Sequence, residues 1–204
     1  MARYPAAAWR PLPEATREPL ITATQVILHT AVSGAASLYG HFSRDDVDLE
    51  SHFYVYQTAV EQYVDTGRQA DANRTANIRA ISIETWDDGN PALVGWTPVQ
   101  MDRLVELVAW LCRTHGIPAR LCAAHDASGI GWHVMFGAPG PWTPVAKSCP
   151  GGREEYEAIH GCGAADACTR ILDKMGAACP VDGFSTGKWE DISPPGEYIA
   201  IRSK

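Results

Sequence analysis

The segment 97–118 constrains the fold most, because it carries the signals for one long amphipathic helix and for both of its ends. Thr97 and Gln100 have the Thr-x-x-Gln spacing of a capping box, and Pro98 occupies the first helical position. Apolar residues then recur at helical spacing until "HGIP", a typical helix stop. A helix of this kind buries one face, so we expect neighbouring apolar runs to form a sheet beneath it.

Short apolar or alternating runs before and after this helix predict the strands of that sheet. They are 24–29, 51–57, 60–67, 80–85 and 119–124. The pair 51–57 and 60–67 is predicted to be a β-hairpin with its bend near Thr58-Ala59. Residues 1–20 are expected to be an extended lead-in, 36–50 a short helix or ordered loop, and the segment from 125 to Pro150 a loop. The order of elements predicts an α/β fold with a central mixed sheet flanked by helices.

Composition narrows the classes of function. The chain has 204 residues, 46% hydrophobic and 20% charged, and a formal net charge of -7, so we expect no nucleic-acid partner. We also expect no membrane span, since no apolar run approaches the roughly 20 residues that one needs. The first 20 residues hold prolines and charges where a signal peptide would be apolar, so synthesis in a cytoplasm is expected.

The run "VILHTAVSG" raises the question of why an apolar strand should end on a histidine, His29. One interpretation is a core histidine with hydrogen-bonded ring nitrogens, and the other is a metal ligand. Together with His133 in "GIGWHVMFG" and Cys149 in "KSCPG", it would make a three-ligand site with one open position, the pattern of catalytic zinc. The three residues lie far apart in the chain, so their spacing leaves both interpretations open.

Seven short motifs, taken in order, resemble the zinc N-acetylmuramoyl-L-alanine amidases, the superfamily of amidase-type phage lysozymes and peptidoglycan recognition proteins. They are "VILHTAVSG", "ESHFYV", "EQYVDT", "AISIET", "WTPVQ", "GIGWH" and "KSCPG". The resemblance covers about residues 4–153 and is greatest to endolysins of phages that infect high-GC Gram-positive bacteria. It implies an amidase fold, bacterial peptidoglycan as partner, synthesis in the host cytoplasm, action on the cell wall after release, and a monomer.

The family's metal ligands correspond to three positions of this sequence. The resemblance implies that His29, His133 and Cys149 bind Zn²⁺, with His125 in "AAHDAS" as the competitor for the second position. The family lysine two residues before the last ligand is Lys147, which would stabilise an oxyanion.

The resemblance further implies that Glu84, at the end of "SIE", is the general base. Some relatives use a tyrosine before "HF" instead, and this chain has Ser51 there, which places more weight on Glu84. Trp86 and Trp142 flank the motifs and are candidates for substrate binding, although tryptophan is also a common loop anchor. His52 is expected to be a packing or supporting residue.

The predicted organisation is a zinc amidase domain over 1–160 and a C-terminal extension over 161–204 that packs on it. Helices at 152–160 and 164–175, a strand at 197–202, and a disulfide or free thiols among Cys162, Cys168 and Cys179 complete the prediction for this part. Two other functions remain open. One is a non-catalytic peptidoglycan-binding module on the same fold, which the presence of Cys149 disfavours. The other is a metal-binding interaction protein built on His160 and the three C-terminal cysteines, whose spacings fit no common zinc motif.

Overall fold

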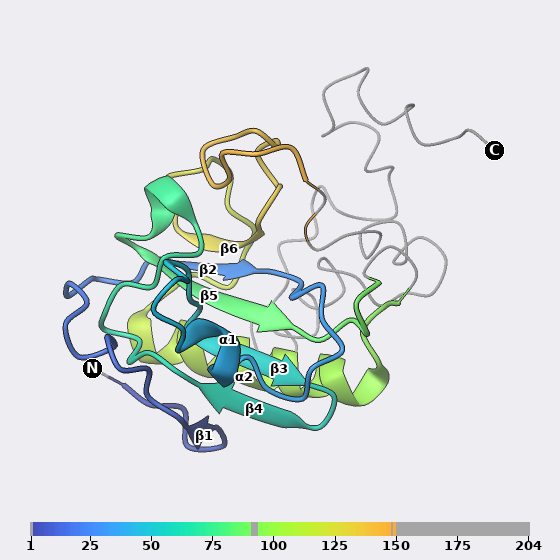
Figure 1. The fold of residues 1–204 in the computed structure, drawn as a ribbon. Helices are drawn as coiled ribbons and strands as arrows, with labels where there is room; N and C mark the ends of the chain where they lie inside the picture. The colour runs from blue at the N-terminus through green and yellow to red at the C-terminus, as the bar shows by residue number, and fades with distance from the viewer. Residues whose placement is uncertain (1, 91–93, 148, 150–204) are drawn as a thin grey trace.

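One mixed sheet forms the centre of the molecule. The structure, a computed structural model, describes residues 2–90, 94–147 and 149. Its strands are β1 (Ala8–Trp9), β2 (Gln25–Leu28), β3 (Phe53–Tyr56), β4 (Ala59–Gln62), β5 (Ala80–Thr85) and β6 (Gly129–Trp132). They lie side by side in the order β1-β4-β3-β5-β2-β6 (Figure 1). Only β3 and β4 pair antiparallel, so the predicted α/β fold with a mixed sheet is confirmed.

The long helix α2 (Pro98–His115) has the bounds that its end signals predict. The Thr97 hydroxyl accepts a hydrogen bond from the Gln100 backbone N–H at 3.1 Å, and Gly116 ends the helix with a φ of 67°. The second half of the predicted capping box does not form. The Gln100 side chain is buried instead and donates to the carbonyl oxygens of Val55 and Trp86 at 3.1 and 3.0 Å. The start of the helix is thereby tied to the sheet.

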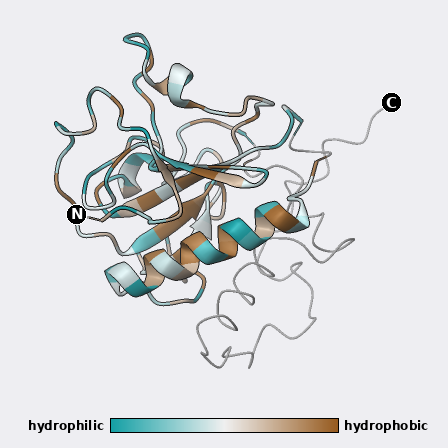
Figure 2. Cartoon of the chain, turned by 90° about the horizontal axis from the view of Figure 1, so that it is seen from below, coloured by the Kyte–Doolittle hydropathy of each residue, from teal (hydrophilic) through white to brown (hydrophobic). Residues whose placement is uncertain are grey.

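The two faces of the sheet are covered differently. On one face, alternate strand residues such as Val26, Leu28 and Ile83 pack against α2 in the main core. On the other, Tyr54 and Tyr63 pack with the short helix α1 (Tyr39–Phe42), which lies in front of the sheet in Figure 1. Figure 2 shows apolar residues concentrated in the strands and recurring along α2. Among the described residues, no helix has the length and apolar character to cross a membrane.

The last strand is not where the sequence predicts it. Residues 119–124 contribute only an isolated bridge, Leu121 to Ile130, whereas β6 lies in the segment predicted to be a loop. The reason is packing: β6 is fully buried, and at Gly131 a Cβ would meet the Trp142 ring at 2.8 Å. Glycine here permits close approach of an aromatic ring, not a flexible loop.

Two smaller differences concern the amino-terminal half of the chain. The lead-in contains the two-residue strand β1, which pairs in parallel with β4. The predicted hairpin forms, but Tyr56 pairs with Ala59, so its two-residue bend is Gln57-Thr58. Gln57 takes the positive φ of 25° that such a bend requires, without the usual glycine. The predicted helices at 152–160 and 164–175, the strand at 197–202 and the packing of the extension lie outside the described residues.

We predict that Gly131→Ala destabilises the protein by about 1–3 kcal/mol, the usual cost of overpacking a core. The new methyl group would contact the Trp142 ring at 2.8 Å and the Met135 sulfur at 3.2 Å. Gly40→Ala is the matched control, because a Cβ at Gly40 has no neighbour within 4 Å. Urea unfolding of both variants measures the difference, and equal midpoints would contradict this account of β6.

Candidate metal centre

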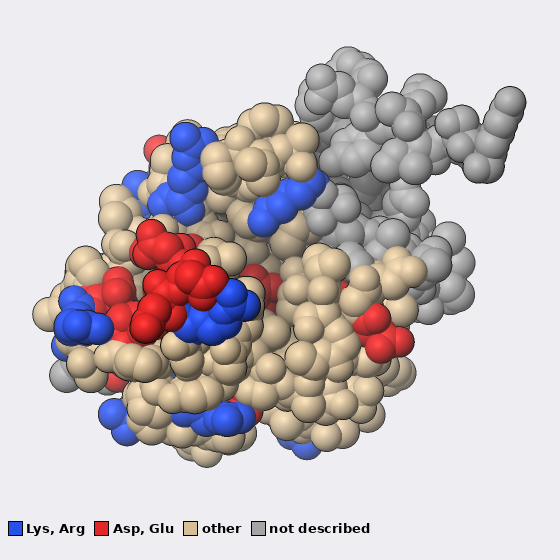
Figure 3. Space-filling view, in the orientation of Figure 1, with Lys and Arg blue, Asp and Glu red and all other residues tan. Residues whose placement is uncertain are grey.

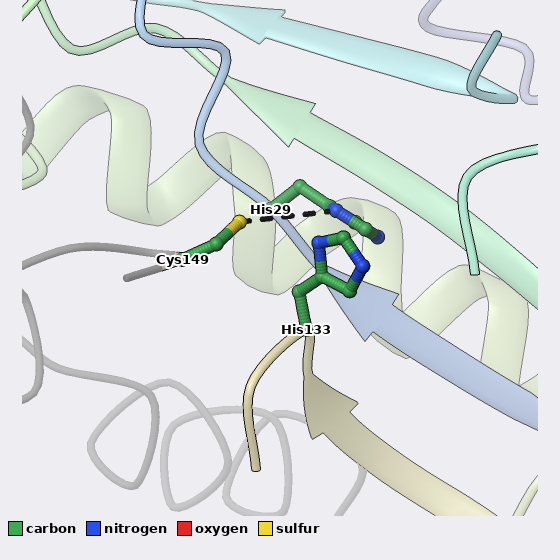
Figure 4. A group of neighbouring side chains, drawn as sticks. All are labelled: His29, His133 and Cys149. Carbon is green, nitrogen blue, oxygen red and sulfur yellow. Dashed lines mark hydrogen bonds between the residues drawn. The ribbon is translucent and has the colours of Figure 1, made fainter. Parts of the chain in front are cut away.

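Two histidines follow directly on two neighbouring parallel strands. Leu28 at the end of β2 is in register with Trp132 at the end of β6, so His29 and His133 leave the same edge of the sheet. Their ring centroids are 4.2 Å apart (Figure 4). The His133 N–H donates to the Leu28 carbonyl at 3.1 Å, which continues the pairing into the site. The position of His29 at a strand end is as the sequence predicts, whereas His133 follows a strand rather than lying within a loop.

Cys149 completes a three-residue cluster. Its sulfur lies 3.9 Å from His29 Nδ1, and the ligand atoms of His29, His133 and Cys149 all lie within 4.8 Å of one another. All three residues are buried. The Cys149 carbonyl accepts from Val134 N–H at 3.2 Å, and its sulfur accepts from Thr30 N–H at 3.4 Å. These contacts hold Cys149 beside the ends of β6 and β2, although it lies 120 positions from His29 along the chain.

The hydrogen bonds of the two imidazoles leave the inner nitrogens available as ligands. His133 Nε2 lies 2.9 Å from the Trp142 carbonyl, which can only accept, so Nε2 carries the proton. Its Nδ1 is then an unprotonated, buried nitrogen without a hydrogen-bond partner among the described residues. His29 Nε2 lies 2.7 Å from Asn73 Oδ1, while its Nδ1 faces the Cys149 sulfur. Two imidazole nitrogens and one sulfur are the donor set of a catalytic zinc with an open position.

Burial keeps both imidazoles in the neutral form that binds a metal. Desolvation, then the neighbouring His133 ring, lowers the pKa of His29 well below its usual value. Desolvation, with a contribution from the Lys147 ammonium, lowers the pKa of His133 to about 4. Because a protonated imidazole cannot bind a metal, depressed pKa values favour binding at neutral pH.

A carboxylate and an ammonium lie next to this cluster. Glu84 near the end of β5 places Oε1 3.7 Å from His29 Nδ1, and its side chain is only 15% exposed. Lys147 is exposed and, with His133, lines a groove of about 290 Å³. Asp71, Arg74 and Asn77 line the groove as well. The two histidines and the cysteine therefore have the Glu84 carboxylate beside them and a groove that holds Lys147 and Arg74.

Strand β5 and the loop after it fix the chain around His29. The Thr85 hydroxyl donates to the His29 carbonyl at 2.6 Å and accepts from the Trp96 indole at 2.9 Å. The buried Asp87 carboxylate accepts from the Thr30 hydroxyl and from two backbone N–H groups of the same loop, at 2.7 and 2.9 Å. His29 is thus held by backbone and loop contacts on both sides.

The two tryptophans differ in their surroundings. Trp142 is buried, its indole N–H donates to the His125 carbonyl at 3.0 Å, and its ring packs edge-on against Phe136. Trp142 also lines the groove beside His133, so its predicted contact with a sugar stays a prediction. Trp86 is only partly buried and packs edge-on against Tyr56.

His125 and His52 lie outside the cluster. The carbonyl of His125 accepts from Gln25 at 2.9 Å, and its ring packs against Phe136 rather than with the three ligands. His52 is buried between Ser82 and the Arg68 carbonyl, at 3.1 and 2.9 Å, so it is a packing residue as expected.

Sequence reasoning missed Asn73, whose side-chain oxygen lies 2.7 Å from His29 Nε2. The residue lies in "NRT", a triplet that resembles a glycosylation signal and carries no other mark. No sequence signal brings it to His29, because 44 positions separate the two residues. Ser51, at the position where some relatives have a tyrosine, is buried and provides no phenolic hydroxyl.

Three acidic residues form a second cluster of ionisable side chains. Carboxylate oxygens of Glu18, Glu50 and Asp71 lie within 4.8 Å of one another, and burial raises the pKa of Glu50 to about 7. The Glu50 carboxyl accepts from the Asp71 N–H at 3.0 Å, which gives it a structural role. The face in Figure 3 carries acidic and basic side chains side by side, and its basic ones do not form one continuous field.

The fold and this cluster define an α/β protein with a candidate catalytic metal centre at the carboxyl edge of its sheet. Residues 20–152, more than half of the chain, match the family model of the N-acetylmuramoyl-L-alanine amidases, so the protein belongs to that family. A search of curated proteins finds no match.

Solved structures share the fold at low sequence identity. The amidase LysC from Clostridium intestinale URNW is 17% identical, with a TM-score of 0.55 over 86% of this chain and 100% of that one. Staphylococcus aureus AmiA, solved in complex with its ligand, is 13% identical, with a TM-score of 0.63 over 88% and 89%. The PlyG catalytic domain is 17% identical, with a TM-score of 0.55 over 85% and 96%.

We predict that His133→Ala and Cys149→Ala each abolish stoichiometric zinc binding, because a three-ligand site has no spare donor. The metal content of the purified variants after dialysis against zinc measures this. His125→Ala is the control and should keep its zinc, since its ring lies outside the cluster. Full occupancy in either cluster variant, or loss in the control, would reject the ligand set.

Proposed function

We propose that the protein is a zinc-dependent peptidoglycan hydrolase that cleaves the amide bond between N-acetylmuramic acid and L-alanine of the stem peptide. The convergence of His29, His133 and Cys149, with Glu84 beside them, in a chain of this family carries the proposal. A zinc ion held by the three ligands would activate water and polarise the scissile carbonyl at neutral pH.

Glu84 and Lys147 supply the remaining chemistry. The Glu84 carboxylate takes the proton of the attacking water as the new C–O bond forms, and delivers it to the L-alanine nitrogen as the C–N bond breaks. Its 3.7 Å distance from His29 Nδ1 supports this role. Lys147 neutralises the negative charge that develops on the carbonyl oxygen. The exposed lysine lines the groove together with His133, which supports its access to a bound amide.

The groove is the place for the substrate chain on either side of the bond. Trp142 lines it and is the second aromatic residue proposed to contact the substrate, while Asp71, Arg74 and Asn77 offer polar contacts. Trp86, partly buried on the Tyr56 ring, is the aromatic residue proposed to contact a sugar.

The biological setting follows from the same proposal. The protein is a phage endolysin, made in the cytoplasm of a high-GC Gram-positive host and active as a monomer on the wall after release. Residues 1–160 form the catalytic domain, and 161–204 form an extension that packs on it.

Product analysis tests the function. Purified peptidoglycan is incubated with the zinc-loaded protein, and the soluble products are analysed by mass spectrometry. Free stem peptides with a new L-alanine amino terminus are expected. Reducing sugar ends would indicate a glycosidase, and binding without any release would indicate the non-catalytic module.

We predict that Glu84→Gln lowers kcat about 10²–10⁴-fold, the usual contribution of a general base, while zinc content and melting temperature stay near wild type. Glu106→Gln on α2 is the matched control, since Glu106 pairs with Arg103 and not with the site. Release of stem peptides over time gives the rates. Activity of Glu84→Gln within a few-fold of wild type would show that another group is the base.

A further inference from the structure

Asn73 is a buried polar residue that the roles above do not include. Its side chain is fully buried, and its Oδ1 lies 2.7 Å from Nε2 of His29. The other ring nitrogen of His29, Nδ1, faces the Cys149 sulfur and the Glu84 carboxylate. The amide oxygen thus contacts the one edge of the imidazole that points away from the cluster.

The segment around Asn73 fixes the backbone of this residue beside His29. The Asn73 backbone N–H donates to Asn77 Oδ1 at 2.6 Å, and the Asn77 amide donates to Asp71 Oδ1 at 2.8 Å. The Asn73 backbone carbonyl accepts from Ala76 N–H at 3.0 Å, at the start of the 3₁₀ helix η1 (Arg74–Ala76). Among the described residues, the Asn73 Nδ2 has no hydrogen-bond partner, so the side-chain amide is aligned on this backbone by its contact with His29.

An amide oxygen can only accept, so this contact selects the His29 tautomer with the proton on Nε2. The lone pair of His29 Nδ1 is then directed at the cluster. The Trp142 carbonyl has the same effect on His133, because it accepts from Nε2 and leaves Nδ1 unprotonated. Both histidines therefore present Nδ1 to the cluster, and a different oxygen atom orients each of them. A neutral amide also avoids placing a third negative charge beside Cys149 and Glu84.

We infer that Asn73 is a positioning residue for the metal centre, which fixes the tautomer and orientation of His29 so that Nδ1 binds the ion. The inference rests on the proposed function, because it assumes that the cluster binds zinc. Partners of this kind, which contact a metal-binding histidine, typically change metal affinity 10–100-fold when they are removed.

The test measures zinc affinity by competition with a chelating dye, using the full chain. Asn73→Ala should weaken zinc binding about 10–100-fold and lower kcat of the zinc-saturated enzyme, with KM near wild type. Asn73→Asp keeps an acceptor oxygen and should restore affinity to within a few-fold of wild type. Thr75→Ala is the control for the same segment, since it removes the hydrogen bond of the Thr75 hydroxyl to the Pro141 carbonyl, at 2.6 Å, without contacting the imidazole; it should keep zinc affinity within a few-fold of wild type.

A second measurement needs no variant. In the wild-type protein loaded with zinc, long-range ¹H–¹⁵N spectra should show His29 protonated on Nε2 and metal-bound through Nδ1. The reverse tautomer, wild-type affinity in Asn73→Ala, or an equal loss of affinity in Thr75→Ala would overturn the inference while leaving the amidase proposal intact. Failure of the wild-type protein to bind zinc would overturn both.

Discussion

The parallel pairing of β2 with β5 on one side and β6 on the other is the constraint on which the site depends. Parallel strands end at the same edge, so the residues that follow β2 and β6 emerge together, and Glu84 near the end of β5 joins them. A slip of one residue in either register would turn a side chain to the opposite face of the sheet. The buried apolar strands on which α2 packs therefore determine where the ligand atoms lie, although they take no part in the chemistry.

Burying polar groups in such a cluster is costly unless each one is paired. The structure meets this on the outer side, where the Trp142 carbonyl and Asn73 accept from the two Nε2 atoms. On the inner side, His133 Nδ1 has no hydrogen-bond partner in the described part of the chain, and burial lowers the pKa of His133 to about 4. A bound cation would offset that cost. The unpaired inner nitrogen is thus the feature that most favours a metal centre over a buried histidine pair.

Local signals predicted the parts of the fold that local physics governs. Helix α2 has the expected ends because a hydroxyl cap, a proline and a left-handed glycine act within a few residues. Strand β5 has the expected bounds because the whole strand pattern lies within the short segment 80–85. Strand β6 was missed, because glycine favours loops until a distant ring, here Trp142, requires close approach.

The sequence by itself determined the class of fold and, through the order of its motifs, the candidate ligands His29, His133 and Cys149 and the neighbouring Glu84. It could not separate a metal ligand from a core histidine, since that depends on what surrounds each ring. Only the tertiary structure decided that the three donor atoms converge, that Trp142 is buried against Phe136, and that Asn73 contacts His29. Each of these depends on contacts between residues far apart in the chain, and such contacts form only when the strands have assembled into the sheet.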